Sequence, residues 1–286
     1  MKLTAYCEDC LIRGQKKKTD DPEYLAWVQK TLDERQEEDS APYMVYLFNQ
    51  EYAVRFGSVH SFQKEKQEYN ELALSMEEPL RRRIESADDP LLESILLARL
   101  GNYIDFGAMN NVDQDTFLSL FDNVSASEND LKTYSQFLSD LDQAETFCLI
   151  ADNCGEIVLD RMMCDEIAKR FPHLQINVMV RGAEVLNDAM AEDALNAGFE
   201  KEQIVSNGNG ASGTVKKLLS KEALDLLETA DVILAKGQGN YETMSGMKRR
   251  LYYSFLCKCP LFIERFHARR LEGMFRMDEY SEQKEF

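Results

Sequence analysis

Three polar side chains in the C-terminal half of the chain have the types that bind hard cations. Asp152 and Asn153 come directly after the apolar run 146–151, and Asp188 lies a few residues beyond the run 175–180. Carboxylate and amide oxygens suit Mg²⁺, Mn²⁺ or a similar divalent ion, whereas thiolates and imidazoles favour zinc. The trio therefore predicts a site for one divalent metal ion. The alternative is that Asp152 and Asp188 only cap the helices that follow them.

A lysine among glycines follows another apolar run. Lys236 comes directly after the run 231–235 and begins the sequence KGQGN. One cation beside the backbone amides of Gly237 and its neighbours is typical of a phosphate-binding loop. A solvated loop lysine explains this motif equally well when it is taken alone. The Walker A spacing is absent, and no G-x-G-x-x-G segment opens the first predicted helix of this half, so a dinucleotide site has little support.

The elements that must position these residues are predicted from the spacing of apolar residues, which changes near residue 142. Before it, apolar residues recur at helical intervals, and Asp-Pro pairs at 21–22 and 89–90 are typical helix starts. After it, short apolar runs alternate with amphipathic helices, which predicts βα units and a mostly parallel sheet. The expected strands are 146–151, 175–180, 203–205, 231–235 and 260–263. The helix after the first strand is expected to bury Leu159, Met163 and Ile167 and to expose Asp160, Asp165 and Lys169.

This pattern predicts an α/β fold, with a Rossmann-like sheet covered by helices on both faces and an N-terminal all-helical domain. The expected domains are residues 1–142 and 143–286. Ligands of open parallel sheets bind beyond the carboxyl ends of the strands. Four successive strands are followed there by polar or glycine-rich loops, which adds Arg181 and Asn187 to the candidates. Four such loops at one rim favour a functional site over coincidental capping.

Composition narrows the class of protein. The chain has 286 residues, with 33 basic and 51 acidic side chains, a formal net charge of −18 and a pI near 4.7. Such a surface repels nucleic acid and anionic membranes, so neither is an expected partner. No apolar run is long enough to span a bilayer, and acidic residues stand where a signal peptide would be apolar. We therefore expect a cytoplasmic protein with reduced thiols and a small-molecule ligand; its oligomeric state stays open.

Several segments together resemble the metal-dependent damage-control phosphatases, a family long catalogued as a domain of unknown function and related to a described acidic-residue methyltransferase. They are DNCGEIVLD at 152–160, VRG at 180–182 with NDA at 187–189, KGQGNYE at 236–242 and GNYIDFG at 101–107. The pair Cys7 and Cys10 is typical of the prokaryotic branch of that family.

The resemblance implies an enzyme that hydrolyses small phosphorylated metabolites, such as sugar phosphates or damaged phosphometabolites, with one divalent ion (Mn, Co, Ni or Mg). Asp152, Asn153 and Asp188 would bind the metal. Lys236 would bind the substrate phosphate across a gap about as wide as that group. Asn102 and Asp105 would reach the cleft from the helical half.

The match is imperfect in the loop that carries Asp188. Where relatives usually have a polar residue, a proline and later a threonine, this chain has Ala183, Glu184 and Met190. Loss of the proline relaxes the loop, and Glu184 adds a negative charge near the site. These changes bear on substrate preference and rate more than on metal binding.

For the reaction, we expect attack by water that the metal activates, with Lys236, Gly237 and Arg181 neutralising the phosphate. A covalent intermediate on Asp152 is the alternative, although a carboxylate that binds metal is a weaker nucleophile. The candidate general bases are Glu156, Asp105 and Glu242.

Two other functions compete with the phosphatase. A non-catalytic protein that binds metal or phosphometabolites fits the altered Asp188 loop. A methyltransferase is less favoured, because the loop after the first strand has one glycine where a methionine-derived cofactor needs several. Cys7, Cys10, Cys257 and Cys259 could form a thiolate site in principle, but we expect Cys7 and Cys10 to be packed thiols on the first helix.

Overall fold

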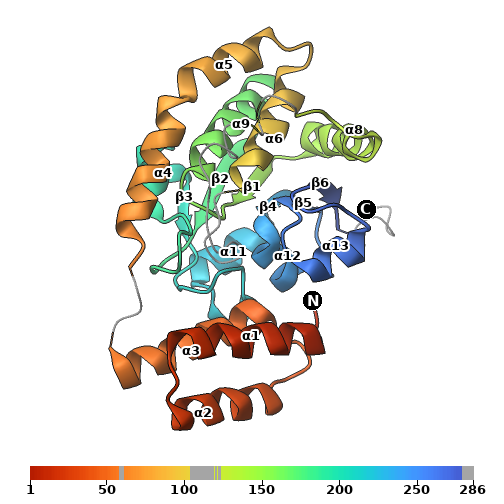
Figure 1. The fold of residues 1–286 in the computed structure, drawn as a ribbon. Helices are drawn as coiled ribbons and strands as arrows, with labels where there is room; N and C mark the ends of the chain where they lie inside the picture. Colours follow the sequence, from red (N-terminus) through yellow and green to blue (C-terminus); the bar gives the residue numbers. More distant parts are fainter. Residues whose placement is uncertain (58–60, 104–118, 120, 122–123, 279–286) are drawn as a thin grey trace.

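Six strands form one sheet in the order β3-β2-β1-β4-β5-β6 (Figure 1). The computed structural model describes residues 1–57, 61–103, 119, 121 and 124–278. The strands are β1 (Thr146–Ile150), β2 (Gln175–Val180), β3 (Ile204–Ser206), β4 (Val232–Lys236), β5 (Leu251–Leu256) and β6 (Gly273–Met277). All neighbouring pairs are parallel except β5 with β6. The order reverses between β1 and β4, so the loops after these two strands border the crevice where such sheets bind ligands.

The first four expected strands are confirmed to within one residue. The fifth, at 260–263, is wrong, because Pro260–Phe266 forms helix α13 with its proline in the first turn. Proline cannot donate to a strand ladder, and its fixed φ suits the start of a helix. The chain instead forms β5 and β6 from two segments that the sequence analysis did not single out.

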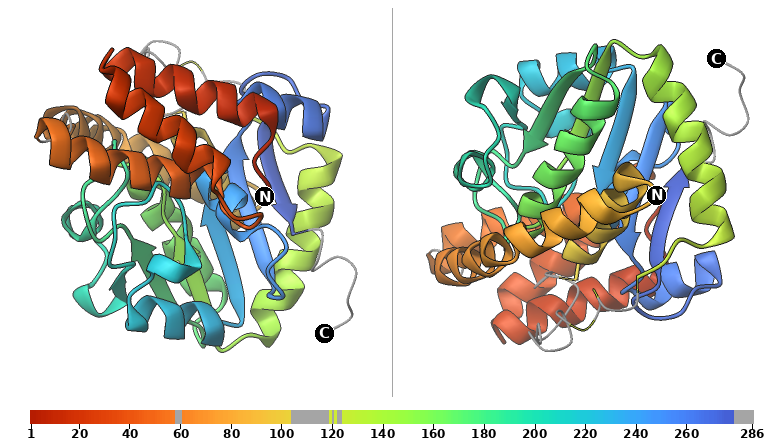
Figure 2. Two further views of the ribbon diagram at one scale, coloured as in Figure 1. Left: turned by 90° about the horizontal axis from the view of Figure 1, so that it is seen from below. Right: turned by 90° about the horizontal axis from the view of Figure 1, so that it is seen from above.

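Helices cover both faces of the sheet, as predicted for the α/β class (Figure 2). Side chains alternate along β1: Phe147 and Leu149 join the core on one face, and Cys148 and Ile150 join the core on the other. The first core includes residues of α6 (Pro90–Gly101), α8 (Glu128–Gln143), α9 (Glu156–Arg170) and α10 (Ala191–Asn196). The second includes residues of α11 (Lys221–Thr229), α12 (Gly237–Met244) and α13.

The N-terminal helices fall into two groups by their packing. The helices α1 (Ala5–Lys18), α2 (Pro22–Asp33) and α3 (Ala41–Phe56) share a separate core centred on Tyr24 and Phe48. In contrast, α4 (Gln63–Ser75) and α5 (Glu77–Ser86) pack through Ala73 and Leu80 onto the core that covers the sheet. The helical character predicted for residues 1–142 is found in the described part of that stretch. A domain boundary at residue 142 stays a prediction.

Local sequence signals begin two of these helices. Asp21 and Asp89 each accept a hydrogen bond from a backbone N–H of the following turn, and a proline occupies the first turn of each helix. These contacts satisfy backbone donors that a helix start otherwise leaves unpaired. Within the described ranges, every helix is too short or too polar to cross a bilayer.

A substitution at Phe137 on α8 tests how much the packing of that helix on the sheet contributes to stability. Its ring is fully buried and lies 4.9 Å from the ring of Tyr252 and 5.6 Å from that of Phe275. We expect Phe137→Ala to lower the free energy of unfolding by about 3–5 kcal/mol, measured in urea. The control Leu131→Ala, on the same helix but half exposed, should cost about 0.5 kcal/mol or less. Equal losses in the two variants would contradict this packing.

Candidate functional site

Backbone contacts bring the Asp188 loop against the loop that carries Asp152 and Asn153. Asn153 and Asp188 form an isolated antiparallel bridge. The N–H of Ala189 donates to the Asp152 carbonyl at 2.7 Å, and the N–H of Cys154 donates to the Asn187 carbonyl at 2.8 Å. The three residues expected to bind metal therefore come from adjoining loops at the carboxyl edge of β1 and β2.

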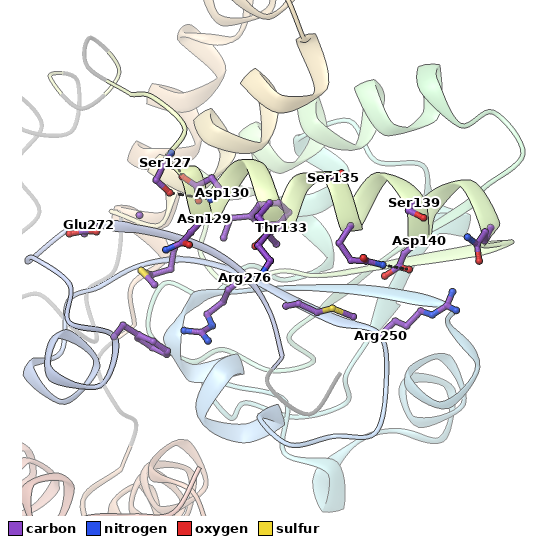
Figure 3. A pocket seen from close by; sticks show the side chains of 18 residues that line it. Ser127, Asn129, Asp130, Thr133, Ser135, Ser139, Asp140, Arg250, Glu272 and Arg276 are labelled. Atoms are coloured by element: carbon purple, nitrogen blue, oxygen red, sulfur yellow. Dashed lines mark hydrogen bonds between the residues drawn. The ribbon is translucent and has the colours of Figure 1, made fainter. Parts of the chain in front are cut away.

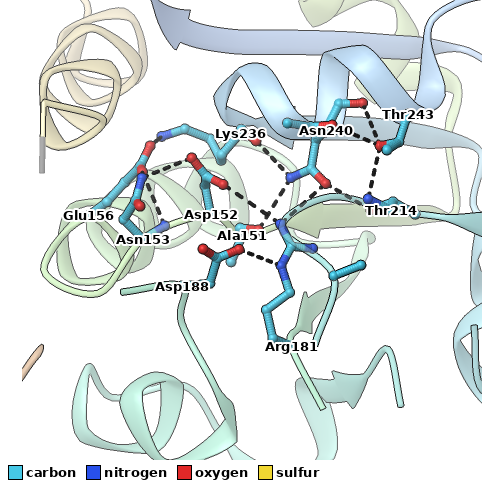
Figure 4. A network of polar contacts seen from close by, with 12 residues as sticks. Ala151, Asp152, Asn153, Glu156, Arg181, Asp188, Thr214, Lys236, Asn240 and Thr243 are labelled. Carbon is cyan, nitrogen blue, oxygen red and sulfur yellow. Dashed lines mark hydrogen bonds and ion pairs between the residues drawn. The ribbon is translucent and has the colours of Figure 1, made fainter. Parts of the chain in front are cut away.

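Arg181 lies between the two aspartates (Figure 4). Its Nε donates to Asp188 Oδ2 at 2.7 Å, and its Nη2 lies 3.7 Å from Asp152 Oδ1. The side chain is only 1% exposed, yet Nη1 has no hydrogen-bond partner among the described residues. A buried guanidinium N–H without an acceptor is costly, so this group is suited to receive an anion.

Two amides orient the acidic side chains. Asn153 Nδ2 donates to Asp152 Oδ2 at 2.8 Å and to Glu156 Oε2 at 2.9 Å. Asn102, at the end of α6, donates from Nδ2 to the same two oxygens at 3.0 and 3.2 Å. Its own Oδ1 accepts from the N–H of Leu256. Because the Asn153 donors are used inside the network, its Oδ1 is the atom suited to a cation.

We expected Lys236 to face the aspartates across a gap. Its ammonium group instead points into a buried cluster of other acceptors. Its Nζ lies 2.6 Å from Asp160 Oδ1, 3.0 Å from Glu156 Oε1 and 2.9 Å from the carbonyl of Ala98. Two of the three N–H donors of this ammonium group are hydrogen-bonded, to Asp160 and to the Ala98 carbonyl, and Glu156 is held by the ion pair. The Lys236 ammonium group is thus linked to Asn153 through Glu156.

The expectation that Asp160 faces water is wrong, because its side chain is completely buried beside Lys236. Burial raises the pKa of Asp160 to about 7, and Lys236 works against this rise. Burial alone would lower the pKa of Lys236, but Asp160 and Glu156 hold it above its ordinary value. Lys236 therefore stays charged. The spacing of Glu156 and Asp160, four apart on one helix face, is the signal that could have identified this pair.

The charge balance of this network fits a cation. Among the described residues of the network, the carboxyl groups of Asp152, Glu156, Asp160 and Asp188 outnumber the cations of Arg181 and Lys236 by four to two, and still by three to two when Asp160 is protonated. Among the described residues, no group of three or more His, Cys, Asp or Glu side chains is placed to hold a metal. Two carboxylates and one amide oxygen are a smaller donor set, which suits an ion that keeps several water ligands, as Mg²⁺ does.

The structure also locates the other candidates. Asn187 is buried, and its carbonyl joins the two loops. Glu242 lies beyond Asn240 on α12, where its carbonyl accepts from the amino group of Met1. Asp105 lies outside the described residues. Glu184 accepts from Ser61 and from the N–H of Phe62, which turns the extra charge of the altered loop toward the N-terminal helices.

Asn240 is a member of the network that the sequence analysis did not single out. Its Nδ2 donates to the carbonyls of Ala151 and Lys236, at 3.3 and 2.7 Å. Its Oδ1 accepts from Thr214 Oγ1 at 2.9 Å and from Arg181 Nη2 at 3.5 Å. This amide therefore joins the loops after β1, β2, β3 and β4. Its position one helical turn after Lys236 was the available signal.

The chain was compared with known proteins. The model of the damage-control phosphatase ARMT1-like domain matches residues 3–272. The chain belongs to this family. A damage-control phosphatase of Pyrococcus horikoshii is 30% identical over 172 residues, 58% of each chain. A damage-control phosphatase of Archaeoglobus fulgidus is 27% identical over 274 residues, 91% of this chain and 93% of the relative.

A crystal structure of a DUF89 family protein from Pyrococcus horikoshii has the same fold. Its TM-score is 0.79 at 23% identity, covering 98% of this chain and all of the other. The predicted family is therefore confirmed, together with the α/β architecture. The chain spans less than two thirds of the length of the first of these relatives.

A cavity of about 1160 Å³ lies away from this network, between α8 and strand β6 (Figure 3). None of the residues of the Asp152 network lines it. Cys7 and Cys10 lie on α1, but Cys10 is exposed, so the expectation that both are packed thiols is wrong.

Gly237, which follows β4 directly, brings the backbone close to the Asp152 side chain. Its φ is +76°, and a Cβ there would overlap the Asp152 carboxylate. Gly246 has a similar φ of +88° with open space around it. We expect Gly246→Ala to cost about 1–2 kcal/mol from backbone strain alone, and Gly237→Ala to cost clearly more because it also displaces Asp152. Thermal unfolding of both variants measures this, and equal losses would show that Asp152 does not pack against Gly237.

Glu242 provides a test by pH. Burial raises its pKa to about 7 from an ordinary 4.5, and the N-terminal amino group opposes this rise. Between these values the folded chain binds the proton more tightly than the unfolded chain, so this residue lowers stability as pH rises. We expect the melting temperature of Glu242→Gln, relative to wild type, to increase between pH 4.5 and 7 and then to level off. The exposed control Glu222→Gln should show no such trend. A difference independent of pH would contradict the raised pKa of Glu242.

Proposed function

We propose that this damage-control phosphatase is a metal-dependent phosphomonoester hydrolase that acts on small phosphorylated metabolites. Asp152, the Oδ1 atom of Asn153 and Asp188 would hold one divalent ion of Mn, Co, Ni or Mg. The observation that carries this proposal is the buried network, in which the described residues place the carboxylates of Asp152, Glu156 and Asp188, and the Asp160 carboxyl group with its raised pKa, beside two cations. Burying that excess of negative charge is unfavourable unless another cation joins it.

A divalent ion bound there would supply Lewis-acid polarisation of the phosphate ester. The chain's own contribution to phosphate binding begins with Arg181, whose Nη1 is buried and has no acceptor in the described structure. The first turn of α12, at Gly237, adds backbone N–H groups and the positive end of a helix dipole. Together they would neutralise phosphate oxygens as charge moves toward the leaving group.

Lys236 would act on the phosphate at longer range than the sequence predicted. It already donates to Asp160 and to the Ala98 carbonyl and is ion-paired with Glu156. Direct contact with a phosphate would require it to exchange one of them, whereas Arg181 needs no exchange. We therefore propose Arg181 as the first phosphate contact and Lys236 as a buried charge that holds Glu156 in place.

Attack by water is favoured over a covalent intermediate on Asp152. Asp152 Oδ2 accepts from two amides, and Oδ1 faces Arg181. These contacts stabilise the carboxylate and lower its nucleophilicity. Glu156 is similarly committed, since it accepts from Asn102 and Asn153 and pairs with Lys236. It would orient Asn153 rather than accept a proton from water.

Release of inorganic phosphate tests the proposal. The purified chain would be incubated with sugar phosphates and phosphopantetheine-like compounds, with and without Mn²⁺, Co²⁺, Ni²⁺ or Mg²⁺. We expect release only with metal, and a loss of about 10²–10³ in kcat/KM or more in Asp152→Ala and Asp188→Ala. Asp142→Ala removes an exposed carboxylate on α8 and should leave the rate unchanged.

Three other outcomes would contradict the proposal. Full activity in the presence of a chelator would show that the reaction does not depend on a metal ion. Tight metal binding without turnover of any substrate would favour the non-catalytic binding protein. Transfer of a labelled methyl group would favour the methyltransferase.

A further inference from the structure

A polar cluster outside the Asp152 network joins α4 to both loops that carry the proposed metal ligands. Asn70, on α4, accepts at Oδ1 from the N–H of Gly155 at 2.6 Å. It also donates from Nδ2 to Asp193 Oδ1 at 2.7 Å. Gly155 ends the loop of Asp152 and Asn153 and is the N-cap of α9.

Asp193 secures the second loop. Its Oδ2 accepts from the N–H of Met190 at 2.8 Å, where the Asp188 loop ends and α10 begins. Lys66 Nζ lies 2.8 Å from the same oxygen. Lys66 and Asn70 are four residues apart, so one face of α4 supplies both contacts. We call Lys66, Asn70 and Asp193 the α4 clasp.

The clasp is shielded from water. Lys66, Asn70 and Asp193 are each between 7% and 8% exposed. In such surroundings a lost partner leaves a backbone N–H unsatisfied rather than hydrated, so each contact strongly constrains the group that it holds. The two loops already share backbone hydrogen bonds near Asp152 and Asn187. The clasp holds them a second time, at the ends where they enter α9 and α10.

We propose that Asn70 is a positioning residue that fixes the separation of the Asp152–Asn153 loop from the Asp188 loop, and with it the geometry of the donor set. The consequence for metal rests on the proposed function, whereas the constraint on the two loops does not. Helix α4 would then have a role beyond covering the sheet.

A charge-conserving exchange of side chains tests this geometry. Asn70→Asp alone places a carboxylate against Asp193, and Asp193→Asn alone places an amide against Asn70. In the double variant, the carboxylate introduced on α4 would accept from the N–H of Gly155 and from the amide introduced on α10. The oxygen of that new amide would accept from the N–H of Met190. The double variant therefore rebuilds each contact of Asn70 with the two side chains exchanged. If Asn70 only filled buried space, the double variant would behave like the single variants.

Two measurements on the full wild-type chain and its variants test this geometry. Amide hydrogen exchange at Gly155 and Met190, without metal, reports the clasp; Mn²⁺ affinity by electron paramagnetic resonance reports the donor set. We expect Asn70→Ala and Asn70→Asp to speed exchange at both amides about tenfold and to weaken Mn²⁺ binding, and the double variant to recover most of both. Ile84→Ala, in the core beneath α5, should lower stability without changing either amide selectively.

Faster exchange at Gly155 alone, or no recovery in the double variant, would overturn the clasp. Altered exchange with unchanged Mn²⁺ affinity would overturn its link to the metal ligands. If the wild-type chain bound no Mn²⁺, the proposed function would fail, while the exchange data would still decide whether Asn70 couples the two loops.

Discussion

The buried contact of Arg181 with Asp152 and Asp188 is the interaction on which the site depends. Charges removed from water are stable only when opposite charges and hydrogen bonds surround them. Here one guanidinium, 1% exposed, lies between two carboxylates. The amides of Asn102, Asn153 and Asn240 supply the remaining contacts. Because these residues come from the end of α6, the loops after β1 and β2, and α12, the network forms only when the sheet and α6 are assembled.

The α/β half of the chain does not complete this site alone. Helix α6 contributes Asn102 to the acidic cluster and the Ala98 carbonyl to Lys236. Gly101 allows this approach, since a Cβ there would lie 2.9 Å from the Cα of Glu156. Helix α4 reaches the neighbouring loops through Asn70. Helices from the N-terminal half therefore form part of the site's walls rather than a separate module beside it.

Sequence reasoning located the loops well because parallel βα units bring strand ends to one edge whatever the details of packing. Asp152, Asn153 and Asp188 were placed together for this reason. It was less successful where burial decides the outcome. Asp160 has the spacing of a solvent-facing residue, but its helix is covered on that side by α6 and by Lys236. For the same reason the buried partners of Lys236 could not be read from a glycine-rich motif.

The elements after residue 250 were predicted less well. The wholly buried run of β5 reads the same as a buried helix segment when only its apolar residues are considered, and Pro260 marked a helix start that was taken for a strand. The positioning contacts of Asn70 and Asn240 depend on which helix face meets which loop. That information appears only in the assembled fold.

The most direct test of the metal site is an anomalous difference map from crystals grown with Mn²⁺. We expect one peak at coordinating distance from a carboxylate oxygen of Asp152, the Oδ1 atom of Asn153 and a carboxylate oxygen of Asp188, with Arg181 beside it. A map with no peak there at saturating Mn²⁺, or with a peak that excludes Asp188, would contradict it.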